Sequence, residues 1–299
     1  MMTVTDRHAY LIIAHNEPEI LQTLIEIIDD VRNDIFIHID KKSDFTTFNG
    51  ISTKHSKLVY TERVNVKWGD ISQVRTELIL METAMKYGNY SFFHIISGVD
   101  LPINNQDYIH ETCKRINKSF VGFAEGSGND KDVIGKTDVF HFFTKYYKNK
   151  FIHSISSILD YAQRFIGIRR KIQLAEDGTQ TILKKGCNWC SLTNSAVQYI
   201  LLRKENILEK FKYTICPDEL FIQSVLWNSP LRNDIFGIDE KKDEYAMCMR
   251  EIDWTRGDPY VWKLEDYTYL MNSKKFFARK FSSQNMDIIK KIEQTILTN

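Results

Sequence analysis

The first hundred residues alternate between short apolar runs and longer stretches of helical periodicity, and this alternation constrains the fold more than any other feature. Four runs are short enough for buried strands, at 9–14, 35–39, 58–60 and 92–96. Two stretches place apolar side chains at helical spacing, at 18–31 and 72–87. Short strand–helix–strand links favour parallel pairing. The sequence therefore predicts an α/β fold with a mostly parallel central sheet flanked by helices.

The rest of the chain continues without a linker, a repeat or a low-complexity tract. Apolar patterns predict strands at 120–123 and 187–192 and helices at 195–206, 219–227 and 286–297. Turn residues predict a loop over 252–260. We therefore expect residues 1–299 to form one domain, with the main part at about 9–235 and a C-terminal extension at about 236–299.

Polar residues follow three of the predicted parallel strands. His15 and Asn16 follow the first, Asp40 follows the second, and Asp100 comes shortly after the strand at 92–96. Each of them alone is a common turn residue. In open α/β sheets, however, ligands bind beyond the carboxyl ends of the strands. Together these residues predict a nucleotide pocket that contains His15, Asp40 and Asp100.

Charge and cysteine content exclude several classes of protein. Forty basic and 39 acidic residues give a net charge of +1, which argues against nucleic acid as a partner. No apolar run is long enough for a transmembrane segment. Five cysteines in 299 residues do not suggest a disulfide framework. Cys187 and Cys190 form a C-x-x-C, but no second ligand pair accompanies it, so we interpret both as small apolar residues of a strand.

Two adjacent carboxylates, Asp218 and Glu219, follow Pro217 directly before an apolar helical run. Proline fits a first helical turn, and acidic side chains there are favoured by the helix dipole. Taken alone, this segment is an ordinary helix start. The other motifs of the chain give a reason to interpret it as part of a functional site.

Six segments in this order resemble the core 2/I-branching β-1,6-N-acetylglucosaminyltransferase family, which also contains the peptide O-xylosyltransferases. They are the segments at 9–16, 37–43, 97–102, 214–221, 250–254 and 277–281. Each motif alone has low specificity, but their common order covers nearly the whole chain. The resemblance implies a GT-A-like nucleotide-sugar transferase fold and makes the single domain a catalytic one.

The resemblance also implies roles for individual residues. Glu219 matches the catalytic base of an inverting transferase, with Asp218 as its rival. Arg250 and Lys280 match the basic pair that neutralises the donor diphosphate, and they lie in the C-terminal extension. Arg279 is the alternative to Lys280. Guanidinium and ammonium groups are chemically suited to phosphate oxygens.

The remaining site residues concern the acceptor and a metal. Glu125 corresponds to an acceptor-binding glutamate, and Trp189 offers a stacking face to a sugar, although core packing is the commoner role of a tryptophan. An Asp-x-Asp of the kind that binds a divalent metal occurs once, at Asp130 and Asp132, in a glycine-rich loop. We interpret it as solvated loop charge and predict no metal and no cofactor. A metal-dependent transferase is the alternative.

The predicted reaction moves a sugar from UDP-N-acetylglucosamine to a hydroxyl of a glycan acceptor, with UDP-xylose, UDP-glucose and UDP-galactose as alternative donors. A non-catalytic protein that binds nucleotide sugars or glycans is the rival of a different class. Animal members of the family typically carry an N-terminal membrane anchor, and this chain shows none. We therefore expect a cytoplasmic bacterial enzyme of polysaccharide biosynthesis. A lipid-linked acceptor and peripheral contact with the inner face of the cell membrane are compatible with that expectation.

Overall fold

The computed structural model describes residues 6–125, 131–174, 179–240 and 242–298. Its main sheet has the strand order β3-β2-β1-β4-β6, in which β1 to β4 are parallel and β6 is antiparallel to β4. A smaller sheet has the order β5-β8-β7. The strands are β1 (His8–Ala14), β2 (Asn33–Ile39), β3 (Lys57–Tyr60), β4 (Phe92–Ser97), β5 (Asp100–Pro102), β6 (Ser191–Thr193), β7 (Arg250–Ile252) and β8 (Phe277–Arg279).

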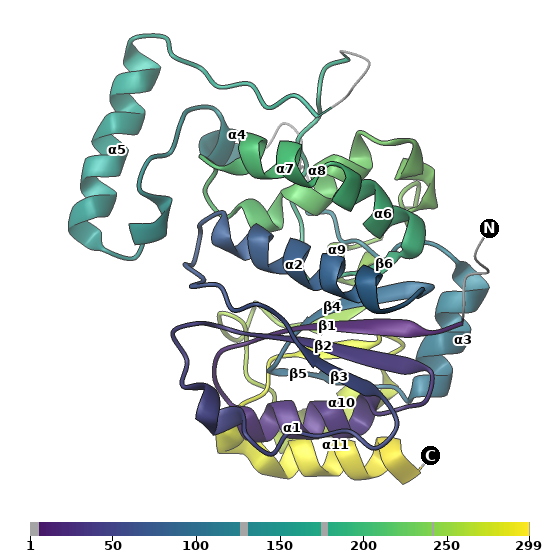
Figure 1. Ribbon diagram of the computed structural model, residues 1–299. Helices are drawn as coiled ribbons and strands as arrows, with labels where there is room; N and C mark the ends of the chain where they lie inside the picture. The colour runs from purple at the N-terminus through teal and green to yellow at the C-terminus, as the bar shows by residue number, and fades with distance from the viewer. Residues whose placement is uncertain (1–5, 126–130, 175–178, 241, 299) are drawn as a thin grey trace.

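Helices cover both faces of the main sheet (Figure 1). Helices α1 and α11 lie on one face, and α2 lies on the other with α6 and α8 beyond it. The helices are α1 (Pro18–Ile28), α2 (Ser72–Tyr87), α3 (Gln106–Ile116), α4 (Lys131–Thr137), α5 (Lys150–Phe165), α6 (Asn194–Leu202), α7 (Lys204–Phe211), α8 (Phe221–Trp227), α9 (Glu244–Met247), α10 (Tyr267–Asn272) and α11 (Met286–Thr298).

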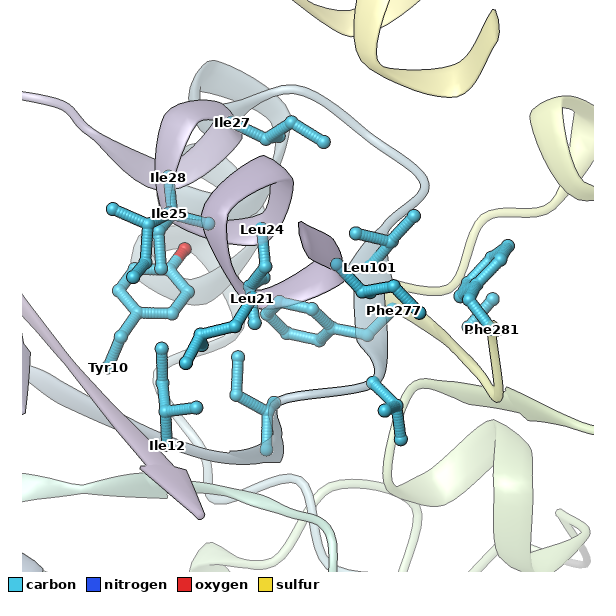
Figure 2. Packing of buried hydrophobic residues seen from close by; sticks show 14 of the residues in the cluster. Tyr10, Ile12, Leu21, Leu24, Ile25, Ile27, Ile28, Leu101, Phe277 and Phe281 are labelled. Carbon is cyan, nitrogen blue, oxygen red and sulfur yellow. The ribbon is translucent and has the colours of Figure 1, made fainter. Parts of the chain in front are cut away.

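Alternate side chains of β1 enter two separate hydrophobic clusters. Tyr10 and Ile12 face α1 and α11 in the first cluster, part of which Figure 2 shows. Ala9 and Leu11 face α2 in the second. This division follows from the alternation of side chains along a strand and explains why β1 reads as continuously apolar. The predicted α/β architecture with a mostly parallel sheet is confirmed.

The C-terminal region is joined to the N-terminal region through the smaller sheet. Strand β8 pairs with β5 on one side and with β7 on the other. Helix α11 adds its buried isoleucines to the first cluster. Figure 2 shows Leu101, Phe277 and Phe281 of the same cluster beside residues of α1. The extension therefore completes the hydrophobic core.

Several predicted boundaries were wrong. Residues 120–123 form no strand, because Phe120 makes only an isolated bridge to Ser191. The strand predicted at 187–192 is shorter and later, at β6. The helix predicted from Glu219 begins only at Phe221, because residues Pro217–Glu219 form a separate 3₁₀ turn. Within the described residues, no helix is long and apolar enough to cross a bilayer.

Candidate active site

The carboxyl ends of β1, β2 and β4 meet at one edge of the main sheet. The backbone N–H of Asp40 donates to the carbonyl of Ala14 at 2.9 Å, which joins the end of β2 to that of β1. Asp40 is buried, whereas the next residue after β1, His15, is exposed. The predicted nucleotide residues His15 and Asp40 thus follow neighbouring strand ends, where α/β folds bind ligands.

Asp100 and Arg279 form an ion pair beside this edge. Asp100 is almost fully buried, and its carboxylate accepts from the guanidinium of Arg279 at 2.8 Å and from the N–H of Ser97 at 2.8 Å. Burial raises the pKa of Asp100, and the positive charge of Arg279 acts against that shift. The same guanidinium lies 4.5 Å from the ring centroid of Trp189. Arg279 therefore connects the predicted residues Asp100 and Trp189.

Lys280 follows Arg279 and has a different environment. Its backbone carbonyl accepts from the N–H of Trp262 at 3.0 Å, and its own N–H donates to Tyr260 at 3.4 Å. Within the described part of the chain, the ammonium of Lys280 makes no hydrogen bond and no ion pair, and the residue is half-buried. A free ammonium on a fixed backbone is suited to bind an anion.

Arg250 lies inside the protein. It is only 1% exposed, and its guanidinium donates to the carbonyls of Cys248 at 2.8 Å and Cys190 at 2.9 Å. It also packs over the ring of Phe277, 4.5 Å from the centroid. These contacts engage both terminal nitrogens of the guanidinium, whereas its buried Nε has no partner among the described residues. The contacts and burial of Arg250 indicate a structural role between the two sheets, and its predicted role toward the diphosphate stays a prediction.

Glu219 ends a tight 3₁₀ turn formed by Pro217–Glu219. The residue before the turn, Cys216, has a left-handed backbone with φ 48°. The carboxylate of Glu219 is 33% exposed, and it accepts from the ammonium of Lys136 at 2.9 Å, with Lys185 at 3.6 Å. Burial alone would lower the pKa of Lys136, but the charge and hydrogen bond of Glu219 outweigh burial and raise that pKa. Two lysines therefore hold a partly exposed carboxylate in a defined position.

The position of Lys185 is fixed by the main chain. The N–H of Gly186 donates to the carbonyl of Glu219 at 2.9 Å. A Cβ on Gly186 would lie 1.9 Å from the carbonyl oxygen of Gly122, so only glycine fits where these two segments cross. The N–H of Ala124 donates to the carbonyl of Lys185 at 2.9 Å. Exposed Glu125, the predicted acceptor residue, thus lies beside the segment that carries Lys185.

Asp218 is buried behind Glu219. Its carboxylate accepts from the amide of Gln73 at 2.7 Å and from that of Asn188 at 3.3 Å, and its second oxygen has no partner among the described residues. Burial and, after it, the negative charge of Glu219 raise the pKa of Asp218 to about 7. A pKa near 7 would suit a base, but the burial of Asp218 and its hydrogen bonds to Gln73 and Asn188 favour a supporting role.

The raised pKa of Asp218 predicts a change in pH dependence when the carboxyl group is removed. A carboxyl that titrates near pH 7 in the folded protein and near 4 in the unfolded chain binds more protons when folded, so its contribution to stability is present below about pH 4 and is lost as the pH rises to about 7. Asp218→Asn should therefore gain stability relative to the parent between pH 5 and 8, by up to roughly 4 kcal/mol. Urea unfolding of both proteins across this range measures the difference, and a constant difference would contradict the assignment.

Asn188 and Trp189 connect the two halves of the site. Asn188 donates to Asp218, the neighbour of Glu219. The next residue, Trp189, lies under the guanidinium of Arg279, the neighbour of Lys280. Asn188 and Trp189 thus connect the segment that carries Glu219 with the segment that carries Lys280.

Some residues of this site were missed in the sequence. Lys136, Lys185 and Gln73 contact the Asp218–Glu219 segment from three distant places in the chain. Arg256 was also missed. Its guanidinium is 43% exposed, pairs with Asp253 and Asp266, and lies over Tyr260, which hydrogen-bonds the backbone of Lys280. The sequence indicated only that Arg256 is a basic residue within the loop predicted at 252–260.

Only one acid of the Asp-x-Asp, Asp132, lies within the described residues. Asp130 lies outside the described residues. The carboxylate of Asp132 accepts from Lys185 at 2.6 Å and lies 3.3 Å from Lys136. Among the described residues, the one group of close potential ligands is His8, His94 and Cys113, which lies within the core. The imidazoles of His8 and His94 already hydrogen-bond each other at 2.9 Å.

Comparison with known families decides the assignment. Residues 8–271 match the family described as "Branch: Core-2/I-Branching enzyme". The chain belongs to this family. It is thus a member of a glycosyltransferase family, as the motifs predicted, and its α/β architecture is consistent with the GT-A-like fold of core-2/I-branching enzymes.

Curated relatives of this core-2/I-branching chain are distant in sequence. Xylosyltransferase 1 of Rattus norvegicus is 24% identical over 98% of the chain, which corresponds to 36% of the relative. Xylosyltransferase 1 of Homo sapiens is 23% identical, with 98% and 31% covered. Xylosyltransferase 2 of Mus musculus is 24% identical, with 93% and 32% covered. The chain thus spans about a third of the length of the curated relatives that it matches.

Proposed function

We propose that this chain is an inverting glycosyltransferase that moves a sugar from a UDP-sugar to a hydroxyl of a glycan acceptor. The observation that carries the proposal is the link between Glu219 and Lys280 through Asn188 and Trp189, within a chain of the core-2/I-branching family. That link connects the neighbour of a partly exposed carboxylate with the neighbour of a free ammonium, which supports the proposal that both groups serve one site. These are the two groups that a single displacement at an anomeric carbon requires.

In the proposed reaction, Glu219 takes the proton of the acceptor hydroxyl. The acceptor oxygen forms a bond to the anomeric carbon as the bond from that carbon to the diphosphate oxygen breaks on the opposite face. An α-linked donor thereby gives a β-glycoside. Lys280 stabilises the negative charge on the departing UDP. Lys136 and Lys185 orient the carboxylate, and Asp218 supports the turn from behind.

Arg256 is the second cation that we propose for the donor side, in place of Arg250. Both its charge and its exposure favour this role, because its guanidinium reaches solvent from the loop that hydrogen-bonds the backbone of Lys280. Two carboxylates share the charge of Arg256, so its contribution should be smaller than that of Lys280.

UDP-N-acetylglucosamine is the donor that we propose first, from the family pattern. The names of the curated relatives make UDP-xylose the principal competitor. Purified protein should be incubated with each of the four candidate UDP-sugars, and UDP release should be measured with and without mixed oligosaccharide acceptors. We expect release from one donor above all others and a rise with acceptor. Binding of UDP-sugars without any release would instead identify a non-catalytic binding protein.

We further propose that catalysis needs no metal. Two ammonium groups already neutralise Asp132, which makes its carboxylate a poor ligand for a divalent cation. UDP release should therefore continue nearly unchanged in excess chelator. A loss of activity that added manganese or magnesium restores would show that the transferase is metal-dependent, with Asp132 as the first residue to mutate.

The cellular setting follows from the same proposal. A glycan acceptor that is built on a lipid carrier would place the enzyme at the cytoplasmic side of a bacterial membrane, in polysaccharide biosynthesis. Fractionation of cells that make the protein, with detection in the cytosolic and membrane fractions, addresses this placement.

A further inference from the structure

Helix α5 has its polar side turned toward the protein. Its only buried residues are Asp160 and Gln163. Asp160 accepts from the imidazole of His141 at 2.8 Å, and the Gln163 amide exchanges two hydrogen bonds with the backbone of Phe140, at 3.0 and 2.9 Å. Helices on a protein surface normally turn their apolar side inward. In α5 this arrangement is reversed.

The outward side of α5 is apolar and open to solvent. Phe151 is 75% exposed, Ile158 is 67% exposed and Phe165 is 80% exposed, and their spacing of seven residues places them along one stripe. Ile155 lies on the same stripe, and Ile166 extends it beyond the helix. Figure 1 shows α5 set apart from the body of the molecule, at the upper left. Exposed apolar patches of this kind mark interaction surfaces.

Positive charge surrounds this apolar stripe. Residues 141–171 contain seven lysines and arginines but a single acidic residue, Asp160, which is buried. The whole chain, by contrast, has 40 basic and 39 acidic residues. Five of the seven cations are exposed, namely Lys145, Lys148, Lys150, Arg169 and Lys171. The positive surplus of the chain is therefore concentrated around α5.

We propose that the α5 face docks on the surface of an anionic lipid bilayer. The α5 face is defined as the apolar stripe of α5 together with the exposed cations at the start of the helix and in the segments on either side of it, Lys145, Lys148, Lys150, Arg169 and Lys171. An apolar stripe flanked by basic residues is suited to lie in the plane of the headgroups, with its rings and branched side chains among the acyl chains. The helix has 16 residues, which is too short to cross a bilayer and long enough to lie on it.

A second copy of the chain fits this face less well. A two-fold dimer would place the same patch of each subunit against the other. Five exposed cations on one copy would then face five on its partner, with no exposed acidic residue between 141 and 171 to compensate. Like charges across an interface oppose association. Anionic headgroups supply the missing negative charge.

The α5 face is joined directly to the candidate active site. Thr144, before α5, donates to Asp70 at 2.8 Å, and Tyr147 packs on Trp68 with ring centroids 5.2 Å apart. Gly69 lies between Trp68 and Asp70 in the sequence. Its carbonyl accepts from the N–H of Cys216, which precedes the Pro217–Glu219 turn. Docking of α5 would thus hold the turn near the bilayer surface. The inference goes beyond the proposed function and does not depend on it.

Vesicle flotation tests the proposal. The full chain should float with vesicles of phosphatidylcholine and phosphatidylglycerol but not with vesicles of phosphatidylcholine alone, and added salt should weaken the binding. A triple variant, Phe151→Ser with Ile158→Ser and Phe165→Ser, should bind at least roughly a hundredfold more weakly, because it removes most of the inserted apolar area. A double variant, Lys150→Glu with Lys171→Glu, should also bind more weakly.

Leu202→Ser is the matched control, because Leu202 is 83% exposed on α6 and belongs to a different surface. It should bind vesicles like the parent. All variants should unfold at the parent's temperature, since the replaced side chains lie on the surface. Three outcomes would overturn the proposal: no binding of the parent to anionic vesicles, equal binding by the triple variant, or a dimer of the parent in solution that the triple variant abolishes. UDP release in vesicle-free buffer should be the same in parent and variants, which separates this test from that of the proposed function.

Discussion

Glu219→Gln is expected to slow sugar transfer by about 10²–10⁴-fold, the usual contribution of a positioned base. Glutamine keeps nearly the same shape and can still accept from Lys136, so the Pro217–Glu219 turn should persist. It cannot take the proton of the acceptor. UDP affinity should change little, because the base contacts the acceptor and not the diphosphate. Transfer kinetics and calorimetric UDP binding on the same protein sample separate the two effects.

Asp218→Asn is the matched control for this result. An asparagine oxygen can still accept from Gln73 and Asn188, so the substitution removes an ionisable group while keeping its contacts. We expect transfer by Asp218→Asn to stay within about tenfold of the parent, well below the loss expected for a base. If Asp218→Asn is inactive and Glu219→Gln is nearly normal, the base is Asp218. If both variants are nearly normal, the segment has no part in the chemistry.

The second large effect is expected at Arg250, on stability. Arg250→Ala should lower the free energy of unfolding by about 3–5 kcal/mol, because it leaves the buried carbonyl of Cys248 without a donor, removes one of the two donors to the carbonyl of Cys190 and opens a cavity beside Phe277. Urea unfolding measures this loss directly. If Arg250→Ala binds less UDP, the decrease should match the decrease in the fraction of folded protein.

Lys280→Ala provides the contrast, because the ammonium of Lys280 makes no contact within the described chain that the substitution would break. We expect unchanged unfolding and a UDP dissociation constant about 10–100 times higher, as for loss of one hydrogen bond to a charged group. Lys274→Ala removes an exposed lysine from the preceding segment and should leave both quantities unchanged. Normal stability with lost UDP affinity in Arg250→Ala would return Arg250 to the diphosphate site.

Most of the sheet was predictable because its central strands β1, β2 and β4 are buried on both faces. The runs around Leu11, Phe36 and Phe93 are apolar at nearly every position, and few other structures require that pattern. Because the strands were predicted, the positions of Asp40 and Asp100 just after the ends of β2 and β4 could also be predicted. Residues 120–123 have a similar composition but form only an isolated bridge and loop contacts. Composition does not show whether a neighbouring strand is present to pair with such a run.

The site was predictable only where a motif carried it. Glu219 was predicted as the base through resemblance, but its lysine partners lie 83 and 34 residues away and belong to no motif. The burial of Arg250 was not predicted, because an arginine followed by Ile252 and Trp254 can begin a buried strand, as β7 does, or lie in an open site. The sequence shows that Arg250 is charged, but it does not show that the buried carbonyls of Cys248 and Cys190 accept its hydrogen bonds.

The crossing of Gly122 and Gly186 limits how this enzyme can diversify. Two main chains in contact leave no space for a side chain, so Lys185 and Glu219 cannot be moved apart by gradual substitution at those glycines. If the proposed acceptor site is correct, variation compatible with the fold should occur at exposed positions beside the crossing, such as Glu125. A mutational library for altered acceptor use should therefore keep both glycines fixed and vary the exposed positions around them.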